Sequence, residues 1–249
     1  MSRPWRALAE ELARWRDAGR TAELWWRDDD AARPDPALAR LLALAERSRV
    51  PLALAVVPLR AERGLFAGLG RGVSVLQHGT DHVNRAAAGE KKTEFPAGEP
   101  APAALERLAR ARERLQELAG ERFMAVLAPP WNRLAPRLLP RLGATYAGLS
   151  QYGARKRAEP SPGLRQVNTH ADIIAWQSGR GFAGEEAAMQ RILAHLGAKR
   201  AGAADASEPT GLLTHHARHD AAAWDFIERL FDATRGAGGV WRDAAHLFR

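Results

Sequence analysis

The sequence predicts an α/β fold, a distorted (β/α) barrel of about seven strands, in one domain that spans residues 1–249. Short β-type runs alternate with longer helical patterns along the chain, and such alternation is typical of parallel strands joined by helical crossovers. Roughly seven such units within one chain of this length favour a barrel over a smaller doubly wound sheet.

Each expected element follows from its own pattern of apolar residues. Residues 2–20 carry tryptophan and leucine at helical spacing, which predicts an amphipathic helix. The apolar runs that predict strands are residues 23–27, 52–57, 73–76, 123–127, 145–148, 172–176 and 211–214, and the helical patterns between them include residues 36–47, 102–118 and 185–196. Residues 84–103 are polar and contain several Pro and Gly residues. Two interpretations of this segment remain: a disordered loop, or a lid over the mouth of the barrel.

Composition limits the classes of function. Hydrophobic residues make up 46% of the chain, enough for a substantial core. The net charge is +8, but the arginines are spread evenly, so we expect no nucleic-acid partner. The absence of cysteine excludes disulfides, thiolate metal sites and a cysteine nucleophile. No apolar stretch has the length of a signal core or a bilayer span, so we expect a cytoplasmic protein without a membrane partner.

Two histidines and an acidic run predict a metal site. His78 and His82 lie four residues apart after a strand candidate, and a helical turn would bring both rings to one divalent ion. The run of three aspartates at residues 28–30 follows the first strand candidate, and adjacent carboxylates hold their charges at a cost unless a cation is near. Two histidines and one aspartate would fill three positions of one divalent ion, with zinc as the expected metal, and leave a fourth for water.

The polar candidates follow predicted strands that are far apart in the sequence. Residues 28–30 follow the first strand candidate, residues 78–82 the third, residues 129–132 the fourth and residues 215–216 the last. Active sites of (β/α) barrels lie at the carboxyl ends of the strands. We therefore expect these segments to meet in one pocket.

Taken in order, these motifs resemble a known family. An aspartate pair, an HxxxH, a proline-aromatic motif, a tryptophan motif and a late Leu-x-His are similar to those of the polysaccharide deacetylases of the NodB-homology type. The resemblance implies a NodB-type barrel and metal-dependent hydrolysis of an N-acetyl group on an amino sugar. It also implies residue roles: Asp29 as general base, Asp30, His78 and His82 as metal ligands, and His215 as general acid.

The register of the acidic run has two readings. The family's second aspartate is followed by a small residue, and Ala31 after Asp30 favours the assignment above. The shifted reading, with Asp28 as base and Asp29 as ligand, remains open.

The chain departs from the family pattern at two positions. Ala128 stands where the family has an arginine that orients the base, and Arg27 is the expected substitute. The family's Asp-x-x-Asp-Trp motif lacks its second carboxylate here, so we expect Asp172 to orient His215 instead.

Several residues near these motifs are candidates for substrate contact. Trp131 could stack on a sugar ring, and Asn132 and His170 add polar groups. The leading hypothesis is an amide hydrolase acting on a small acylated sugar or similar amide. A catalytically silent barrel that binds metal or carbohydrate is the alternative, and a nucleic-acid binder, based on charge alone, is a third; metal-dependent acetate release and salt-dependent affinity separate them.

Overall fold

The computed structural model describes residues 2–249 and contains a parallel α/β barrel, which confirms the predicted fold class. The strands are β1 (Glu23–Ala31), β2 (Leu52–Val56), β3 (Val73–Gln77), β4 (Phe123–Leu127), β5 (Gly148–Leu149), β6 (Arg165–Gln166), β7 (Ala171–Asp172), β8 (Thr210–Thr214) and β9 (Val240–Trp241). The helices are α1 (Arg3–Asp17), α2 (Pro36–Ser48), α3 (Gly64–Ala67), α4 (Ala101–Ala119), α5 (Leu139–Leu142), α6 (Glu185–Arg200), α7 (Ala221–Gly236) and α8 (Ala244–Leu247).

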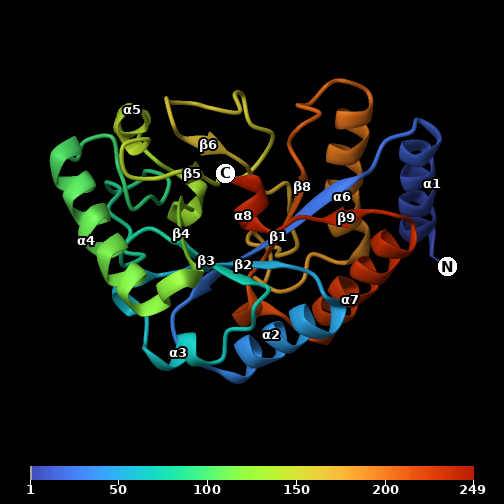
Figure 1. Ribbon diagram of the computed structural model, residues 1–249, viewed down its shortest axis with the longest axis horizontal. Coiled ribbons are helices and arrows are strands. Elements are labelled where there is room, and N and C mark those ends of the chain that lie inside the picture. Colours follow the sequence, from blue (N-terminus) through green and yellow to red (C-terminus); the bar gives the residue numbers. More distant parts are fainter. Residues whose placement is uncertain (1) are drawn as a thin grey trace.

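All the strand pairings within residues 2–249 are parallel, in the order β6-β5-β4-β3-β2-β1-β8-β7, and β9 joins the side of β1. Residues 165–172 pair first with β5 and then with β8. This irregular segment therefore links the two ends of the sheet. The helices lie around the strands, with α1 packed against α6 and with α2 beside α7 (Figure 1).

Strand β1 runs through the centre of the molecule and alternates between two cores. Trp25 faces the inside of the barrel, where its ring meets Phe248 edge-on at 6.0 Å. Trp26 faces outward and packs edge-on against Phe231 of α7 at 4.9 Å. Because side chains of a strand alternate between its faces, Arg27 belongs to the inner face. Helix α8 follows Trp241 and packs against the inner residues.

Two of the helices that cover the barrel begin at an aspartate cap. Asp35 caps α2 by accepting a hydrogen bond from the Leu38 amide at 2.8 Å, and Pro36 occupies the first helical position. Asp220 caps α7 in the same way. The face of α7 toward the barrel is apolar except for Thr234, and its apolar side chains join the main core. Among residues 2–249, no helix has the length and apolar character needed to span a membrane.

Some predicted strands differ in extent from those observed. The first continues to Ala31, so the acidic run lies within β1 rather than after it. The predicted strand at residues 145–148 is reduced to β5, and that at residues 172–176 to β7. Both strands are short because neighbouring residues make irregular bridges and turns instead of a continuous ladder.

Candidate active site

Three side chains converge at the carboxyl ends of β1 and β3. The Nε2 atoms of His78 and His82 each lie 3.1 Å from Oδ1 of Asp30. His78 is buried, whereas His82 and Asp30 are partly exposed. Burial alone would raise the pKa of Asp30, but the hydrogen bonds and charges of the histidines lower it far below its ordinary value. Two imidazole nitrogens and one carboxylate oxygen in contact with each other form a donor set that fits a zinc-type ion with an open fourth position.

A local irregularity in β1 brings Asp30 to this cluster. The pairing of β1 with β2 shifts register between Asp28 and Ala31, and Asp30 has a φ of 73°. A bulge of this kind turns one side chain away from strict alternation. His82 also has a positive φ, 55°, at the end of the turn that follows His78.

Asp29 points into the barrel and is held by Arg27. The guanidinium donates from Nε to Oδ1 at 2.8 Å and from Nη2 to Oδ2 at 2.9 Å, and both side chains are buried. Nη1 donates to the carbonyl and hydroxyl oxygens of Ser150, and Nη2 donates to Asn132 Oδ1 at 3.0 Å. The charge of Asp29 opposes the effect of burial and helps to raise the pKa of His78, so it lies close to the candidate ligands. The two-pronged contact with Arg27 uses one lone pair on each carboxylate oxygen of Asp29, so each oxygen keeps a further lone pair.

Asp28 lies on the opposite face of β1 and belongs to a separate polar group. Its Oδ2 accepts from the Thr214 hydroxyl at 2.6 Å and from the His216 amide at 3.0 Å, and its Oδ1 accepts from His216 Nδ1 at 2.5 Å. With Asp28 fully buried there, the geometry favours the register in which Asp29 and Asp30 belong to the site.

His215 directly follows β8, whose last residue, Thr214, pairs with Asp28 of β1, so it lies at the carboxyl end of β1. Its charge is one of the contributions that lower the pKa of Asp30. It is buried, and its Nδ1 has no hydrogen-bond partner. The ring of Trp176 meets it edge-on at 4.7 Å.

Asp172 was expected to orient His215, and no hydrogen bond joins the two side chains among residues 2–249. Asp172 instead accepts from Trp176 Nε1 at 2.7 Å and from the Ile174 amide at 2.9 Å. Burial raises the pKa of Asp172, although the nearby charge of His215 opposes this. Asp172 thus holds the ring of Trp176, and that ring in turn lies edge-on against His215.

The segment after β4 contributes to the mouth of the site. Trp131 lies against the ring of His82 with centroids 4.4 Å apart, and both Trp131 and Asn132 have a φ of 55°. Asn132 supports Arg27 and also lines a cavity of about 340 Å³ next to the site. Gln151 and Arg133 line the same cavity, together with Thr93 and other residues of the segment after His82.

His170 lies elsewhere, which differs from its expected contact with substrate. It is buried at the amino end of β7, stacked on His195 with centroids 3.3 Å apart and near Glu208. The Gly211 amide donates to His170 Nδ1 at 3.0 Å, so the proton of the neutral ring is on Nε2, which faces Glu208 Oε2 at 3.4 Å. Since a protonated nitrogen cannot ligate a metal, this second His-His-Glu group does not fit an ion.

Sequence reasoning did not identify the residues that support the site from other strands. Ser150 follows β5 and holds Arg27, but a lone serine after a short strand carries no signal in the sequence. His216 was visible as the neighbour of His215, yet its pairing with Asp28 depends on the alignment of β1 with β8.

Solved structures with the same fold are carbohydrate esterases of family 4, CE4. A peptidoglycan N-acetylglucosamine deacetylase is 13% identical, with a TM-score of 0.59, over 92% of this chain and 88% of its own. An acetyl xylan esterase from Clostridium thermocellum, solved with a cobalt ion, is 14% identical, with a TM-score of 0.53, over 91% of this chain and 90% of its own. A CE4 family pseudoenzyme from Bacillus anthracis is 10% identical, with a TM-score of 0.60, over 92% of this chain and 66% of its own. No family model and no curated protein sequence matches the chain.

This similarity supports the polysaccharide-deacetylase type of barrel predicted from the motifs. At 10–14% identity it establishes the fold alone.

Proposed function

We propose that this protein is a metal-dependent hydrolase that removes an N-acyl group, in the first place N-acetyl, from an amino sugar or similar small amide. The main support is the convergence of Asp30, His78 and His82 beside the buried Arg27–Asp29 pair. One structural neighbour is a peptidoglycan N-acetylglucosamine deacetylase, and that activity agrees with the proposal.

Each residue would have one role in the reaction. Asp30, His78 and His82 would hold the ion, and a zinc-type ion bound there supplies polarisation of the acyl oxygen and a water of lowered pKa. Asp29 would take the proton of the attacking water on its free lone pair while Arg27 keeps the carboxylate aimed. His215 would donate a proton to the leaving amine.

The surroundings of the acid and base explain how they could stay in place. Arg27 bonds to residues of three separate segments, so Asp29 is attached to a rigid part of the barrel. The ring of Trp176 confines His215 on one side. Because Nδ1 of His215 has no hydrogen-bond partner, the bound substrate would determine which ring nitrogen carries the proton.

Metal analysis and an amine-release screen test the proposal. The purified protein should hold one equivalent of metal after dialysis and release amine from N-acetylated sugars. Asp30→Asn and His78→Ala should lose metal and turnover together, whereas Asp29→Asn and His215→Ala should keep metal and lose turnover by about 10²–10⁴-fold. His246→Ala, which removes an exposed histidine of α8, is the control and should change neither. Full metal retention in His78→Ala would contradict the assignment.

A silent metal-binding or carbohydrate-binding barrel is the second candidate. It is favoured by Ala128 in place of an arginine, by the use of Asp172 to hold Trp176, and by a neighbour described as a pseudoenzyme. Stoichiometric metal without amine release from any acetylated sugar or acetyl ester would support it over the hydrolase.

A further inference from the structure

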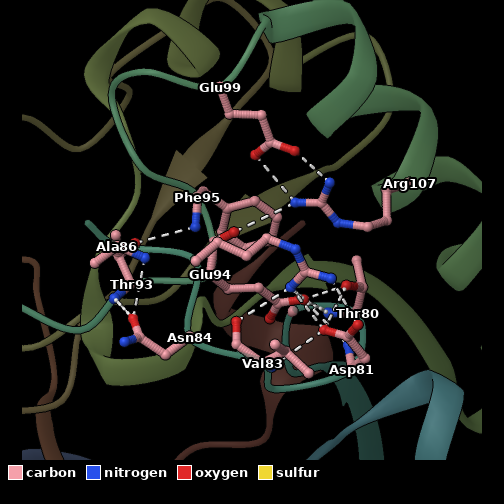
Figure 2. A network of polar contacts seen from close by, with 12 residues as sticks. Thr80, Asp81, Val83, Asn84, Ala86, Thr93, Glu94, Phe95, Glu99 and Arg107 are labelled. Carbon is pink, nitrogen blue, oxygen red and sulfur yellow. Dashed lines mark hydrogen bonds and ion pairs between the residues drawn. The ribbon is translucent and has the colours of Figure 1, made fainter. Parts of the chain in front are cut away.

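The turn between His78 and His82 is held by a residue from outside the barrel. Glu94 lies in the segment at residues 84–100, and its side chain is completely buried. Its Oε1 accepts from the amides of Thr80 and Asp81, at 2.9 and 3.1 Å, and from the Thr80 hydroxyl. Figure 2 shows this carboxylate directed at the turn.

Two carbonyl groups of the turn are bound by the barrel. Gln77 Nε2 donates to the Gly79 carbonyl at 3.0 Å, and the Leu59 amide donates to the Thr80 carbonyl at 2.9 Å. The barrel thus supplies donors for the carbonyl groups, and Glu94 supplies the acceptor for the two successive amides. Because buried amides need an acceptor, the turn depends on Glu94 for its conformation.

Close packing fixes the carboxylate against the backbone of Gly79. This glycine has a φ of 61°, and a Cβ at this position would overlap Glu94 Oε2 and would come within 2.5 Å of Pro130 Cδ. Only glycine tolerates both the dihedral angle and this approach. Arg85 forms a two-pronged ion pair with Asp81 and lies 3.6 Å from Glu94, so the buried carboxylate has a cation near it.

Helix α4 holds the backbone of Glu94. Arg107 Nη2 donates to the Glu94 carbonyl at 3.3 Å, and the same guanidinium forms an ion pair with Glu99. The neighbours of Glu94 in sequence, Thr93 and Phe95, line the cavity beside the site. The segment that borders the cavity is therefore also the segment that fixes the turn.

We propose that Glu94 is a positioning residue for the metal site, which sets the spacing and aim of His78 and His82 through the turn between them. This inference rests on the proposed metal site. Glu94 acts through backbone amides, without contact with the ion or the substrate. Loss of such an outer contact typically weakens metal binding about 10–100-fold.

Three substitutions at one position separate this role from a general loss of stability. Glu94→Gln keeps an oxygen for both amides and the hydroxyl, Glu94→Asp keeps the charge but is one methylene too short to reach both amides, and Glu94→Ala removes the acceptor. Glu106→Gln and Glu106→Ala, on an exposed part of α4, are the matched controls. Zn²⁺ affinity is measured by competition with a chromophoric chelator, Co²⁺ geometry by visible absorption, and exchange of the Thr80 and Asp81 amides by hydrogen–deuterium exchange.

Glu94→Asp and Glu94→Ala should bind Zn²⁺ about 10–100-fold more weakly, change the Co²⁺ spectrum and exchange both amides faster. Glu94→Gln should remain near wild type in all three, as should both Glu106 variants. If Glu94→Ala does not fold, the contrast between Glu94→Asp and Glu94→Gln decides.

Two results would count against the inference or its basis. Unchanged amide exchange, affinity and Co²⁺ spectrum in Glu94→Asp would overturn the role of Glu94. A wild-type protein that binds no metal would refute the proposed site instead, and amide exchange would still report whether Glu94 holds the turn.

Discussion

Replacing Arg27 by methionine should destabilise the protein strongly, because it leaves the carboxylate of Asp29 buried without its cation. The guanidinium makes two bonds to Asp29, two to Ser150 and one to Asn132, all between 2.6 and 3.0 Å. Breaking one side of a buried ion pair costs about 3–5 kcal/mol. For a domain of this size that corresponds to a fall in Tm of roughly 6–20 °C.

A double-mutant cycle with Asp29→Asn isolates the charge. In the Asp29→Asn background no charge is stranded, so Arg27→Met should cost only about 1–3 kcal/mol, the penalty of unmade hydrogen bonds. Arg27→Lys keeps the charge but cannot form the two-pronged contact, so it should fall between wild type and Arg27→Met. Denaturant unfolding of wild type, the two single variants and the double variant of the cycle, and Arg27→Lys provides the free energies. An equal cost of Arg27→Met in both backgrounds would refute the stranded-charge explanation.

Three further predictions concern two buried histidines and the aromatic ring beside His215, the proposed acid. Burial lowers the pKa of His195 to about 2. The stability contributed by its neutral ring is therefore present above about pH 6.5 and is lost as pH falls. Thermal melts from pH 7 to 4 should show less acid destabilisation in His195→Gln than in wild type. Burial alone would lower the pKa of His216, but the facing carboxylate of Asp28 raises it, so the protonated ring stabilises the fold and this contribution is lost as pH rises above about 6.5. His216→Gln should remove that loss of stability at alkaline pH. An unchanged dependence of stability on pH in this variant would contradict the pairing. Trp176→Ala should lower turnover by up to about 100-fold with metal content unchanged, because it frees the ring of His215; amine release and metal analysis on one preparation check this.

The fold was predictable because the strands are apolar runs whose spacing reflects their helical crossovers. The strong signals, such as residues 52–57 and 123–127, correspond to β2 and β4. β6 and β9 were missed because each has two residues and owes its conformation to a neighbouring strand rather than to its own pattern. The segment at residues 84–100 looked like a disordered loop or a lid, and neither reading anticipated a buried carboxylate that contacts the turn after β3.

The candidate site was only partly predictable, since the sequence reveals which residues follow a strand but not the face to which each points. Asn168 and His170 lie in a polar stretch typical of a site, yet the pairing with β8 buries His170 at the amino end of its strand. Asp172 was expected to orient His215, but its carboxylate accepts from Trp176 Nε1 and from the Ile174 amide, and the sequence shows neither contact.

Strand geometry gives the three adjacent aspartates three different chemical settings. Side chains at positions i and i+2 of a strand share a face, so Arg27 and Asp29 meet inside the barrel whatever the loops around them do. Asp28 must face the other way, where His216 neutralises it. Asp30 would also face outward, but the bulge before Ala31 redirects it to the histidines. The family resemblance places the orienting arginine on a different strand, at the position of Ala128. In this chain an arginine two residues before Asp29 makes such a contact from the same face of one strand, and Ser150 and Asn132 hold its guanidinium from two other segments.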